Sequence, residues 1–599
     1  MYFRDIINRL LAIIEPLIHQ FPYVFITMKL MGIVSIVYSI EDLIQEIGKG
    51  EALIILVQRI SLVFLFAYIG ALIICIAKSH YLKLIIKITF YFVGLILYAT
   101  TFFLTTNFAF EIDNPTLITL IAETTSSESD EFIKQYILSS NIIPTLKKIV
   151  AYLLAIVCVE LLWSKYRNKL ERLRITKTIL TIITIPLLLF GFYSIGIYYR
   201  IYNCDTAEEI DLIKSPKDPI SSVFVSWRKF TMMSECMENY ILLNQNIYDQ
   251  VTSCKVSSDS LNLVVVIGES HIKWHSPLYG YYLNTSPNLI REKERGRLFK
   301  FNDVITSSNS TSIIMKNILC CNNSSSGEQW YNYPNFLTIF KKAGYDVYFW
   351  DNQKDFAKKE SYSYTLNNFL YNSEILKISY TAVNDSSFQY DEDIVDSYIN
   401  TVGTLKGKQN IVVFHLMGQH TMPSERYPNE FSNFTEDSIT NSLPFINNMM
   451  KSTIAHYDNA SLYNDYVINR IISLFKNSNT LLVYFSDHGE EIYDYREKIG
   501  RSFGDLNSNI LKFQYDVPFV IWCSDIFIMK YPEKINQIKS AVDYPFMIDN
   551  VCNMLFNVAG ITTPFYRDSL DLISPNYRCN ERIINQKYKY EFIRNSLEN

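Results

Sequence analysis

The distribution of apolar residues divides the chain into two parts. The first ~200 residues hold long apolar runs broken by short basic clusters, whereas short apolar runs alternate with polar stretches from residue 261 onward. A bilayer core about 30 Å thick requires ~20 residues of apolar helix, and five runs qualify. They are Pro22 to Ile40, Leu53 to Ala77, Leu84 to Thr105, Ile149 to Trp163 and Thr178 to Tyr199. The pattern predicts an α-helical transmembrane domain of about five helices over residues 1–200.

Charged residues between these runs predict how the chain is oriented in the membrane. Cytoplasmic loops keep Lys and Arg. Basic residues precede the first run and separate the second from the third and the fourth from the fifth: Arg4, Arg9, Lys78, Lys83, Lys87, Lys165, Arg167, Lys169, Arg172, Arg174 and Lys177. The alternate loops are acidic: Glu41, Asp42, Glu46, Glu51, Glu111, Asp113, Glu123, Glu128, Asp130 and Glu131. We therefore expect a multi-pass protein of a bacterial inner membrane, with everything after Tyr199 in the periplasm.

The segment 201–260 predicts a linker between two domains. It is too polar to cross a membrane, and it lacks the pattern of a catalytic core. Its short amphipathic pieces, Val223 to Met233 and Tyr240 to Tyr248, are suited to lying on a membrane surface. A solvent-exposed linker with helical turns explains them equally well.

The remaining residues, 261–599, predict an α/β domain with a mainly parallel sheet. Short, continuously apolar runs rich in β-branched residues alternate with helical stretches, which is typical of a parallel sheet covered on both faces. The candidate strands are Leu261 to Ile267, Phe299 to Ile305, Asp346 to Trp350, Asn410 to Leu416, Thr480 to Phe485 and Val517 to Trp522. In such sheets the chemistry lies beyond the carboxyl ends of the strands.

Composition removes one class of partner and suggests disulfides. The net charge is -5, so the chain has no overall basic surface of the kind that binds nucleic acid. Eight cysteines follow the last apolar run, and none has the CxxC spacing of a zinc ribbon: Cys204, Cys236, Cys254, Cys320, Cys321, Cys523, Cys552 and Cys579. In an oxidising compartment these residues are expected to form disulfides. A monomer is the simplest expectation, although nothing in the sequence fixes the oligomeric state.

Metal-capable side chains follow two of the candidate strands. Glu269 is the first acidic residue after LVVVIG, and the run YFSDHGEE places Asp487 and His488 directly after another strand. Each alone has an ordinary explanation, since a carboxylate at a strand end often serves a turn or a cap. In VVFHLMGQH, His415 fits the core of the strand, whereas His420 lies past a glycine and is the better functional candidate.

A hydroxyl nucleophile is expected in the run TSSNSTSIIMKNIL, a polar turn that leads into an apolar helix. Ser310, Thr311 and Ser312 compete, and a hydroxyl at a helix start is usually an N-cap. The same place also binds anions, because backbone N–H groups point outward there. A Glu, an Asp, a His and a hydroxyl together suit a divalent cation that lowers the hydroxyl pKa and polarises a phosphoryl oxygen.

The order IGES, LYGYYLNTSPNL, VITSSNSTS, HLMGQH with RYP, and SDHGEE resembles the phosphoethanolamine transferases of the alkaline phosphatase and sulfatase superfamily. The resemblance covers spans, linker and soluble domain. It implies a periplasmic catalytic domain that takes phosphoethanolamine from phosphatidylethanolamine. The implied acceptor is an envelope glycolipid, either lipopolysaccharide core or lipid A, with motifs closer to the core-sugar branch.

Carried over residue by residue, the resemblance implies a zinc site and a nucleophile. Glu269, Thr311, Asp487 and His488 would bind Zn²⁺, and Thr311 would carry a covalent phosphothreonine. His420 would assist the phosphate or a second metal. Asn352 and Gln353, in FWDNQ, match polar residues that line the substrate pocket.

One departure from the family pattern concerns a second histidine. Related lipid A enzymes have another His downstream of DHGE, but this chain has none between Glu490 and Trp522, and Phe513 or Gln514 stands where some relatives have it. The departure puts a stable second zinc in question, together with the way phosphoethanolamine is held.

Three other functions compete with this interpretation. A phosphoglycerol transferase of the same superfamily shares the anchor, the threonine and the metal site. A non-catalytic glycolipid-binding membrane protein would not need Glu269, Asp487 or His488, and all three are present. A sulfatase would need a CxPxR-like context, which neither Cys320 nor Cys321 has.

Overall fold

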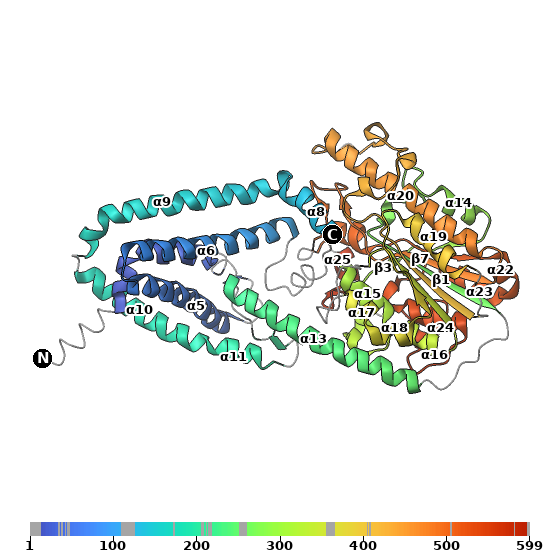
Figure 1. Ribbon diagram of the computed structural model, residues 1–599, viewed down its shortest axis with the longest axis horizontal. Coiled ribbons are helices and arrows are strands. Elements are labelled where there is room, and N and C mark those ends of the chain that lie inside the picture. The colour runs from blue at the N-terminus through green and yellow to red at the C-terminus, as the bar shows by residue number, and fades with distance from the viewer. Residues whose placement is uncertain are drawn as a thin grey trace. The chain divides into compact units, whose positions relative to one another are not determined.

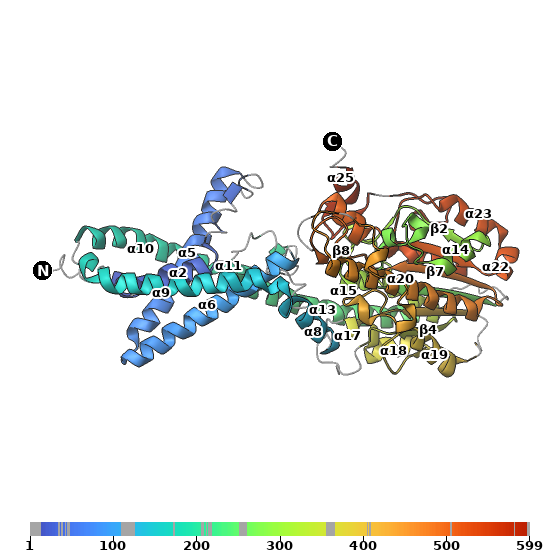
Figure 2. The ribbon, with the colours of Figure 1, turned by 90° about the horizontal axis from the view of Figure 1, so that it is seen from above.

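The chain forms two compact units, shown as ribbons in Figures 1 and 2. The computed structural model describes residues 13–33, 36, 40–41, 44, 48–108, 126–171, 174–204, 209–210, 213, 218–250, 260–354, 366–403, 405, 409–441, 443–502, 506–579 and 581–595. The first unit comprises Met1–Ile121 and Phe132–Met233, and the second comprises Ala122–Glu131 and Ser234–Asn599.

The first unit is helical, and among its described residues three helical segments are long and apolar enough to cross a membrane. Its helices include α2 (Phe21–Leu30), α5 (Lys49–Ile76), α6 (His80–Phe108), α9 (Ile143–Glu171), α10 (Arg174–Ser194) and α11 (Gly196–Tyr202). The three qualifying segments are Lys49–Ile76, His80–Phe108 and Ile179–Tyr202. They match the second, third and fifth predicted spans.

The other two predicted spans keep the status of predictions. Helix α2 covers only part of the first, which extends into residues outside those described, and α9 runs through the fourth. The orientation depends partly on Arg4, Arg9, Asp42, Glu46, Glu111, Asp113, Glu123 and Arg172, which also lie outside the described residues.

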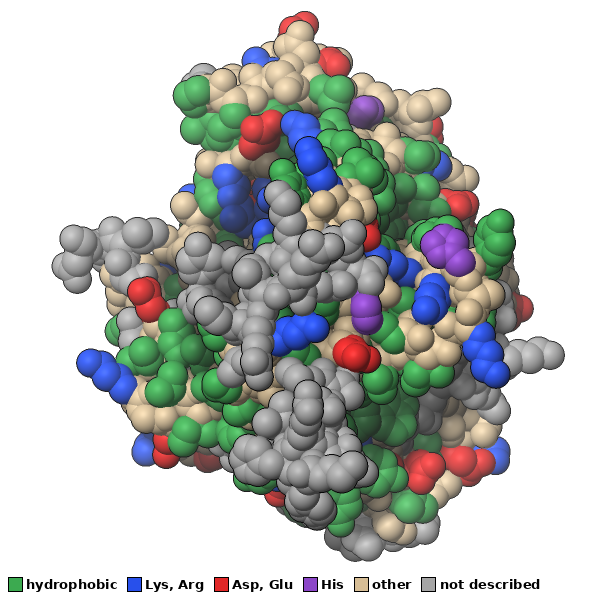
Figure 3. Space-filling model, turned by 90° about the vertical axis from the view of Figure 1, so that its left-hand side faces the viewer, with side chains coloured by type: hydrophobic (Ala, Val, Ile, Leu, Met, Phe, Trp, Pro, Cys, Tyr) green, Lys and Arg blue, Asp and Glu red, His purple; other side chains and the backbone are tan. Residues whose placement is uncertain are grey.

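Close packing inside this unit coexists with an apolar exterior. A Cβ added to Gly191 of α10 would lie 2.7 Å from the carbonyl oxygen of Ser61 in α5, so the glycine allows the two backbones to approach. On α6, by contrast, Ile85 and Phe92 are 60% and 62% exposed. Figure 3 shows hydrophobic side chains on one face of the molecule, among polar and charged ones. Exposed apolar side chains of this kind are suited to contact with lipid.

The second unit is built on a seven-stranded sheet with the strand order β2-β10-β7-β1-β6-β4-β5. The strands are β1 (Leu261–Gly268), β2 (Leu298–Lys300), β4 (Asp346–Asp351), β5 (Ala382–Val383), β6 (Gln409–His415), β7 (Thr480–Ser486) and β10 (Phe519–Cys523). Strands β7, β1, β6, β4 and β5 are parallel, whereas β10 is antiparallel to β7 and to β2. The predicted mainly parallel sheet is confirmed.

Helices cover both faces of this sheet, as the buried apolar strands require. In Figure 1, α14 (Pro287–Glu294), α19 (Asp391–Val402) and α20 (Asn448–Phe475) lie on one face. On the other face lie α15 (Thr311–Leu319), α16 (Phe336–Lys342), α17 (Leu366–Tyr371), α18 (Ser373–Ser379) and α24 (Val551–Ala559). Every residue of β1, β6 and β7 is buried.

Two sequence expectations differ from the structure of this unit. The predicted strand Phe299 to Ile305 is split into β2 and β3 (Val304–Ile305), and β3 pairs with β11 (Phe546–Met547) outside the main sheet. The break falls at Asp303, whose carboxylate accepts a hydrogen bond of 2.8 Å from Arg582. The two amphipathic pieces of the linker lie in one helix, α13 (Pro219–Gln250).

The expected disulfides are absent from four buried cysteines. Cys320, Cys321, Cys523 and Cys552 are free thiols. Burial raises the pKa of Cys320, Cys321 and Cys523, which keeps these groups protonated and unreactive. The prediction of disulfides is therefore wrong for these four residues, while Cys254 lies outside the described residues.

Candidate active site

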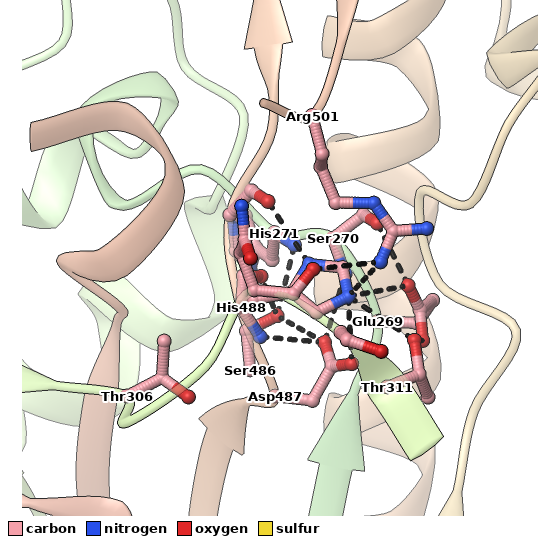
Figure 4. A network of polar contacts seen from close by, with 12 residues as sticks. Glu269, Ser270, His271, Thr306, Thr311, Ser486, Asp487, His488 and Arg501 are labelled. Atoms are coloured by element: carbon pink, nitrogen blue, oxygen red, sulfur yellow. Dashed lines mark hydrogen bonds and ion pairs between the residues drawn. The ribbon is translucent and has the colours of Figure 1, made fainter. Parts of the chain in front are cut away.

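The ends of two adjacent strands bring three metal-capable side chains together. Strands β1 and β7 pair in parallel with Gly268 opposite Ser486, so the next residues, Glu269 and Asp487, leave the sheet side by side. His488 follows, and all three side chains are fully buried. Their ligand atoms lie within 4.8 Å of one another. Figure 4 shows the cluster at close range.

Thr311 completes the group from the first turn of α15. Its Oγ1 lies 3.1 Å from Glu269 Oε2 and 3.1 Å from His488 Nε2. Ser310 is the N-cap residue, and its side chain makes no capping hydrogen bond. Of the three competing hydroxyls, Thr311 is therefore the one for which the structure gives contacts to the metal-capable side chains.

The donor set fits a divalent metal such as zinc. Asp487 Oδ2 is buried and accepts no hydrogen bond. His488 Nδ1 lies 2.9 Å from the carbonyl oxygen of Gly489, so it carries the ring hydrogen and Nε2 keeps its lone pair. That Nε2 lies 3.1 Å from Asp487 Oδ2 and 3.4 Å from Glu269 Oε1. Two carboxylates, a neutral imidazole and a hydroxyl are ligands that zinc accepts.

Electrostatics favour the neutral imidazole, but without a cation they oppose ionisation of both carboxyl groups at once. Burial and the nearby Arg501 lower the pKa of His488 to about 3, so the ring is neutral at pH 7. Burial and the charge of Glu269 raise the pKa of Asp487 well above its ordinary value. A bound cation would relieve this repulsion between carboxylates.

Backbone geometry around Glu269 holds the ligands in place. Ser270 has a φ of 56°, a left-handed conformation that is unfavourable for a residue other than glycine. In that conformation its Oγ donates to Glu269 Oε1 at 2.7 Å, and its N–H donates to Asp487 Oδ1 at 3.1 Å. Tyr457 fixes the turn by donating from its hydroxyl to the carbonyl oxygen of Ser270 at 2.6 Å.

Two glycines allow other segments to approach these ligands. Gly418, after β6, has a φ of +51°, and a Cβ there would lie 2.7 Å from the carbonyl oxygen and 2.8 Å from the nitrogen of Glu269. A Cβ on Gly489 would lie 2.1 Å from the carbonyl oxygen of Phe513. Neither position has room for a side chain.

The remaining predicted site residues lie near the cluster in different ways. Gln353 donates to Glu269 Oε2 at 3.2 Å and to the carbonyl oxygen of Leu416 at 2.8 Å. His420 is half-buried and directly follows Gln419, whose N–H donates to the carbonyl oxygen of Glu269 at 3.0 Å. Asn352 is buried and binds Asp391 Oδ1 and the N–H of Phe388, so its amide is engaged within the fold.

His415 belongs to the core, which was one of the two explanations open for it. The ring is fully buried, and Nδ1 lies 2.8 Å from Asp351 Oδ1. Asp351 also accepts a hydrogen bond from the hydroxyl of Tyr371 at 2.6 Å. These contacts join β6, β4 and α17 beneath the site.

Sequence reasoning missed Arg501. Its Nη1 lies 2.6 Å from His488 Nε2 and donates to the carbonyl oxygen of Asn309 at 3.0 Å. Arg501 follows the short hairpin of β8 (Glu491–Ile492) and β9 (Ile499–Gly500). The sequence held one indication, because the segment that lacks the downstream histidine contains this arginine.

A buried ion cluster holds the tip of the β8–β9 hairpin. His275 Nδ1 lies 2.7 Å from Asp458 Oδ1, and its Nε2 lies 2.9 Å from Asp494 Oδ1. Tyr281 donates to the other oxygen of Asp458 at 2.9 Å. Burial opposes the charge on His275, but Asp458 and Asp494 raise its pKa to about 10. The ring is therefore protonated at pH 7.

The fold and this cluster can be compared with known classes of protein. Residues 261–545 match the sulfatase family model. A metal-capable cluster beyond the carboxyl ends of a mainly parallel sheet agrees with that match.

The particular relatives are phosphoethanolamine transferases, as the sequence motifs indicated. The chain is 27% identical to phosphoethanolamine transferase EptC of Escherichia coli over 476 residues, covering 78% of each chain. It is 24% identical to phosphoethanolamine transferase CptA of Salmonella typhimurium, again covering 78% of each. The integral membrane lipooligosaccharide phosphoethanolamine transferase A of Neisseria meningitidis shares the fold, with a TM-score of 0.52, 16% identity and coverage of 94% of this chain and 97% of that one.

Proposed function

We propose that this protein is a membrane-anchored transferase that moves phosphoethanolamine from phosphatidylethanolamine to an envelope glycolipid, either lipopolysaccharide core or lipid A. The observation that carries the proposal is the position of Thr311 Oγ1, 3.1 Å from both Glu269 and His488. The similarity to phosphoethanolamine transferases extends over most of the chain, which supports the choice of transferred group. Its predicted location is the inner membrane with residues 261–599 in the periplasm.

In this proposal Glu269, Thr311, Asp487 and His488 hold a zinc ion. When bound, such an ion lowers the pKa of a hydroxyl and stabilises charge on a phosphoryl oxygen. Glu269 Oε2 accepts the Thr311 hydrogen bond and orients Oγ1, while Ser270 and Gln353 hold Glu269. The first turn of α15 directs backbone N–H groups toward an incoming phosphate.

The proposed reaction has two half-reactions. The Thr311 hydroxyl loses its proton to water, its oxygen forms a bond to phosphorus, and the bond from phosphorus to the glycerol oxygen breaks. Diacylglycerol leaves and takes a proton from water. An acceptor oxygen then attacks the phosphothreonine, and Thr311 regains its proton as the product leaves. Because both lipids are bulky, a single site need hold only one of them at a time.

Intact-mass measurement tests the covalent step. The full chain in detergent micelles, given phosphatidylethanolamine alone, should gain one phosphoethanolamine group. Thr311→Ala should lose the adduct, and Thr311→Ser, which keeps the hydroxyl, should retain part of it. Ser310→Ala and Ser312→Ala are the matched controls. An adduct that persists in Thr311→Ala and maps to Ser310 or Ser312 would show that the serine, and not Thr311, is the nucleophile.

The acceptor is tested separately. We favour the core sugar, because the motifs resemble that branch more closely. Mass spectrometry of lipopolysaccharide from cells with and without the gene should show a phosphoethanolamine increment on the core fragment. An increment confined to lipid A would overturn this preference.

A further inference from the structure

Arg501 makes no direct ion pair in the part of the chain that the structure describes, although its charge lowers the pKa of the nearby carboxyl groups of Glu269, Asp487 and Glu490 against the effect of burial. No ion pair within 4.0 Å involves its guanidinium there, and both of its hydrogen bonds, to His488 Nε2 and to Asn309, use Nη1. In Figure 4 its side chain reaches toward Thr311 and Glu269. The guanidinium therefore keeps N–H donors that no carboxylate in the described part of the chain engages.

Buried hydrogen bonds fix the position of Arg501 relative to Thr311. Asn309, two residues before Thr311, donates from Nδ2 to the carbonyl oxygen of Ser502 at 2.8 Å and to Gln514 Oε1 at 2.7 Å. The N–H of Ser502 donates to the same Gln514 oxygen at 3.0 Å. The segment before Thr311 and the segment around Arg501 are therefore held together by hydrogen bonds among Asn309, Ser502 and Gln514. Gln514, one of the two residues that stand where some relatives have the downstream histidine, forms these hydrogen bonds.

The contact between Arg501 and His488 must change when His488 binds a metal. A neutral imidazole cannot give the same Nε2 lone pair both to a cation and to an arginine N–H. Once His488 serves as a metal ligand, Nη1 loses that acceptor, and the guanidinium faces the oxygen of Thr311 with most of its donors available. Planar guanidinium donors match the geometry of phosphate oxygens.

We infer that Arg501 binds the phosphate of the donor lipid and of the group carried on Thr311. The inference rests on the proposed function. Two N–H groups of Arg501 hold the non-bridging oxygens while the Thr311 oxygen bonds to phosphorus and the glycerol oxygen leaves with a proton from water. Backbone N–H groups at the start of α15 face the same phosphate. Arg501 thus supplies a positive charge at the phosphate in a chain that lacks the downstream histidine of related lipid A enzymes.

The test uses the zinc-loaded full chain in detergent micelles. Three variants are compared with wild type: Arg501→Ala, Arg501→Lys and the matched control Arg470→Ala, whose side chain pairs with Asp396 away from the site. The measurements are the rate of phosphoethanolamine adduct formation from phosphatidylethanolamine, the zinc content and the thermal stabilisation produced by inorganic phosphate.

We expect Arg501→Ala to slow adduct formation about 100- to 1,000-fold while keeping the zinc content of wild type. Arg501→Lys should recover part of the rate, because it restores the charge without the planar pair of donors. Arg470→Ala should match wild type. Inorganic phosphate should raise the melting temperature of wild type and of Arg470→Ala, and should leave that of Arg501→Ala unchanged.

Two results would overturn the inference. One is an adduct rate for Arg501→Ala within about threefold of the Arg470→Ala rate. The other is a zinc loss in Arg501→Ala that accounts for its lost rate, because Arg501 would then support His488 and not the substrate. If wild type forms no adduct at all, the proposed function fails, and the phosphate stabilisation still decides whether Arg501 binds an anion.

Discussion

Replacing Gly418 by alanine tests whether the backbone of a ligand residue controls the metal site. Gly418 contacts no substrate in this scheme, yet its Cα faces the backbone of Glu269. The new Cβ would lie 2.7 and 2.8 Å from the oxygen and nitrogen of Glu269, closer than carbon atoms approach such groups. Backbone atoms cannot rotate away as a flexible side chain can, so Glu269 must move.

The size of the effect follows from two contributions. A left-handed backbone costs alanine about 1–2 kcal/mol, whatever its surroundings. Gly327→Ala pays the same cost, because Gly327 has a φ of +75° and nothing within 4 Å of the added Cβ. The difference between the two variants isolates the displacement of Glu269. Metal–ligand distances tolerate only about 0.2 Å, and disturbing groups that support a ligand weakens metal binding roughly 10- to 100-fold.

The assay is zinc retention by the full chain during dialysis against a graded series of chelator concentrations, followed by elemental analysis. Melting temperatures are recorded in parallel. We expect metal-free Gly418→Ala to melt below metal-free Gly327→Ala, because only the former displaces the buried backbone of Glu269, and we expect zinc to be lost from Gly418→Ala at about 10- to 100-fold lower chelator strength. Equal zinc retention in both variants would refute the argument that contact with Glu269 controls the site.

Three further predictions concern the ligands, the ion cluster and the membrane orientation. His488→Ala and Asp487→Ala should each lose most of the roughly one zinc bound per chain, whereas the control His456→Ala should keep it. Unchanged zinc content in the His488 and Asp487 variants would show that these residues are not metal ligands. His275→Gln should lower stability by about 3–5 kcal/mol near pH 6, because it leaves two buried carboxylates without their cation. The pKa of His275 is raised to about 10, so this contribution is complete below pH ~6.5 and declines as the pH rises toward 10. Thermal melts that show the same deficit at pH 6 and pH 10 would contradict it. A periplasm-specific reporter fused after residue 599 should be active, and activity of a cytoplasm-specific reporter there would reverse the predicted orientation.

The sequence predicted the parts of the site that local patterns determine. Buried strands are visible as apolar runs, and the residues that follow them must meet at one edge of a parallel sheet. For that reason Glu269, Asp487 and His488 can be grouped from the order of residues alone. Thr311 can be narrowed to a helix start by local patterns, and the family resemblance selects it among the neighbouring hydroxyls.

Other features depend on contacts between distant segments and could not be predicted. Arg501 reaches the site because Gln514 joins Ser502 to Asn309, far away in the chain. The free thiols of Cys320 and Cys552 depend on tertiary burial, which residue counts do not reveal. Arg582, from near the other end of the chain, binds Asp303 in the break between β2 and β3.

The β8–β9 hairpin places Arg501 on a different part of the fold from the residues able to hold the metal. The residues able to hold the metal stand on the central sheet and on α15, where any displacement disturbs the core. Arg501 stands on a short excursion outside that sheet, anchored by Asp494 at its tip and by Ser502 at its base. The group that meets the substrate phosphate can therefore change within residues 490–502 without displacing the residues able to hold the metal.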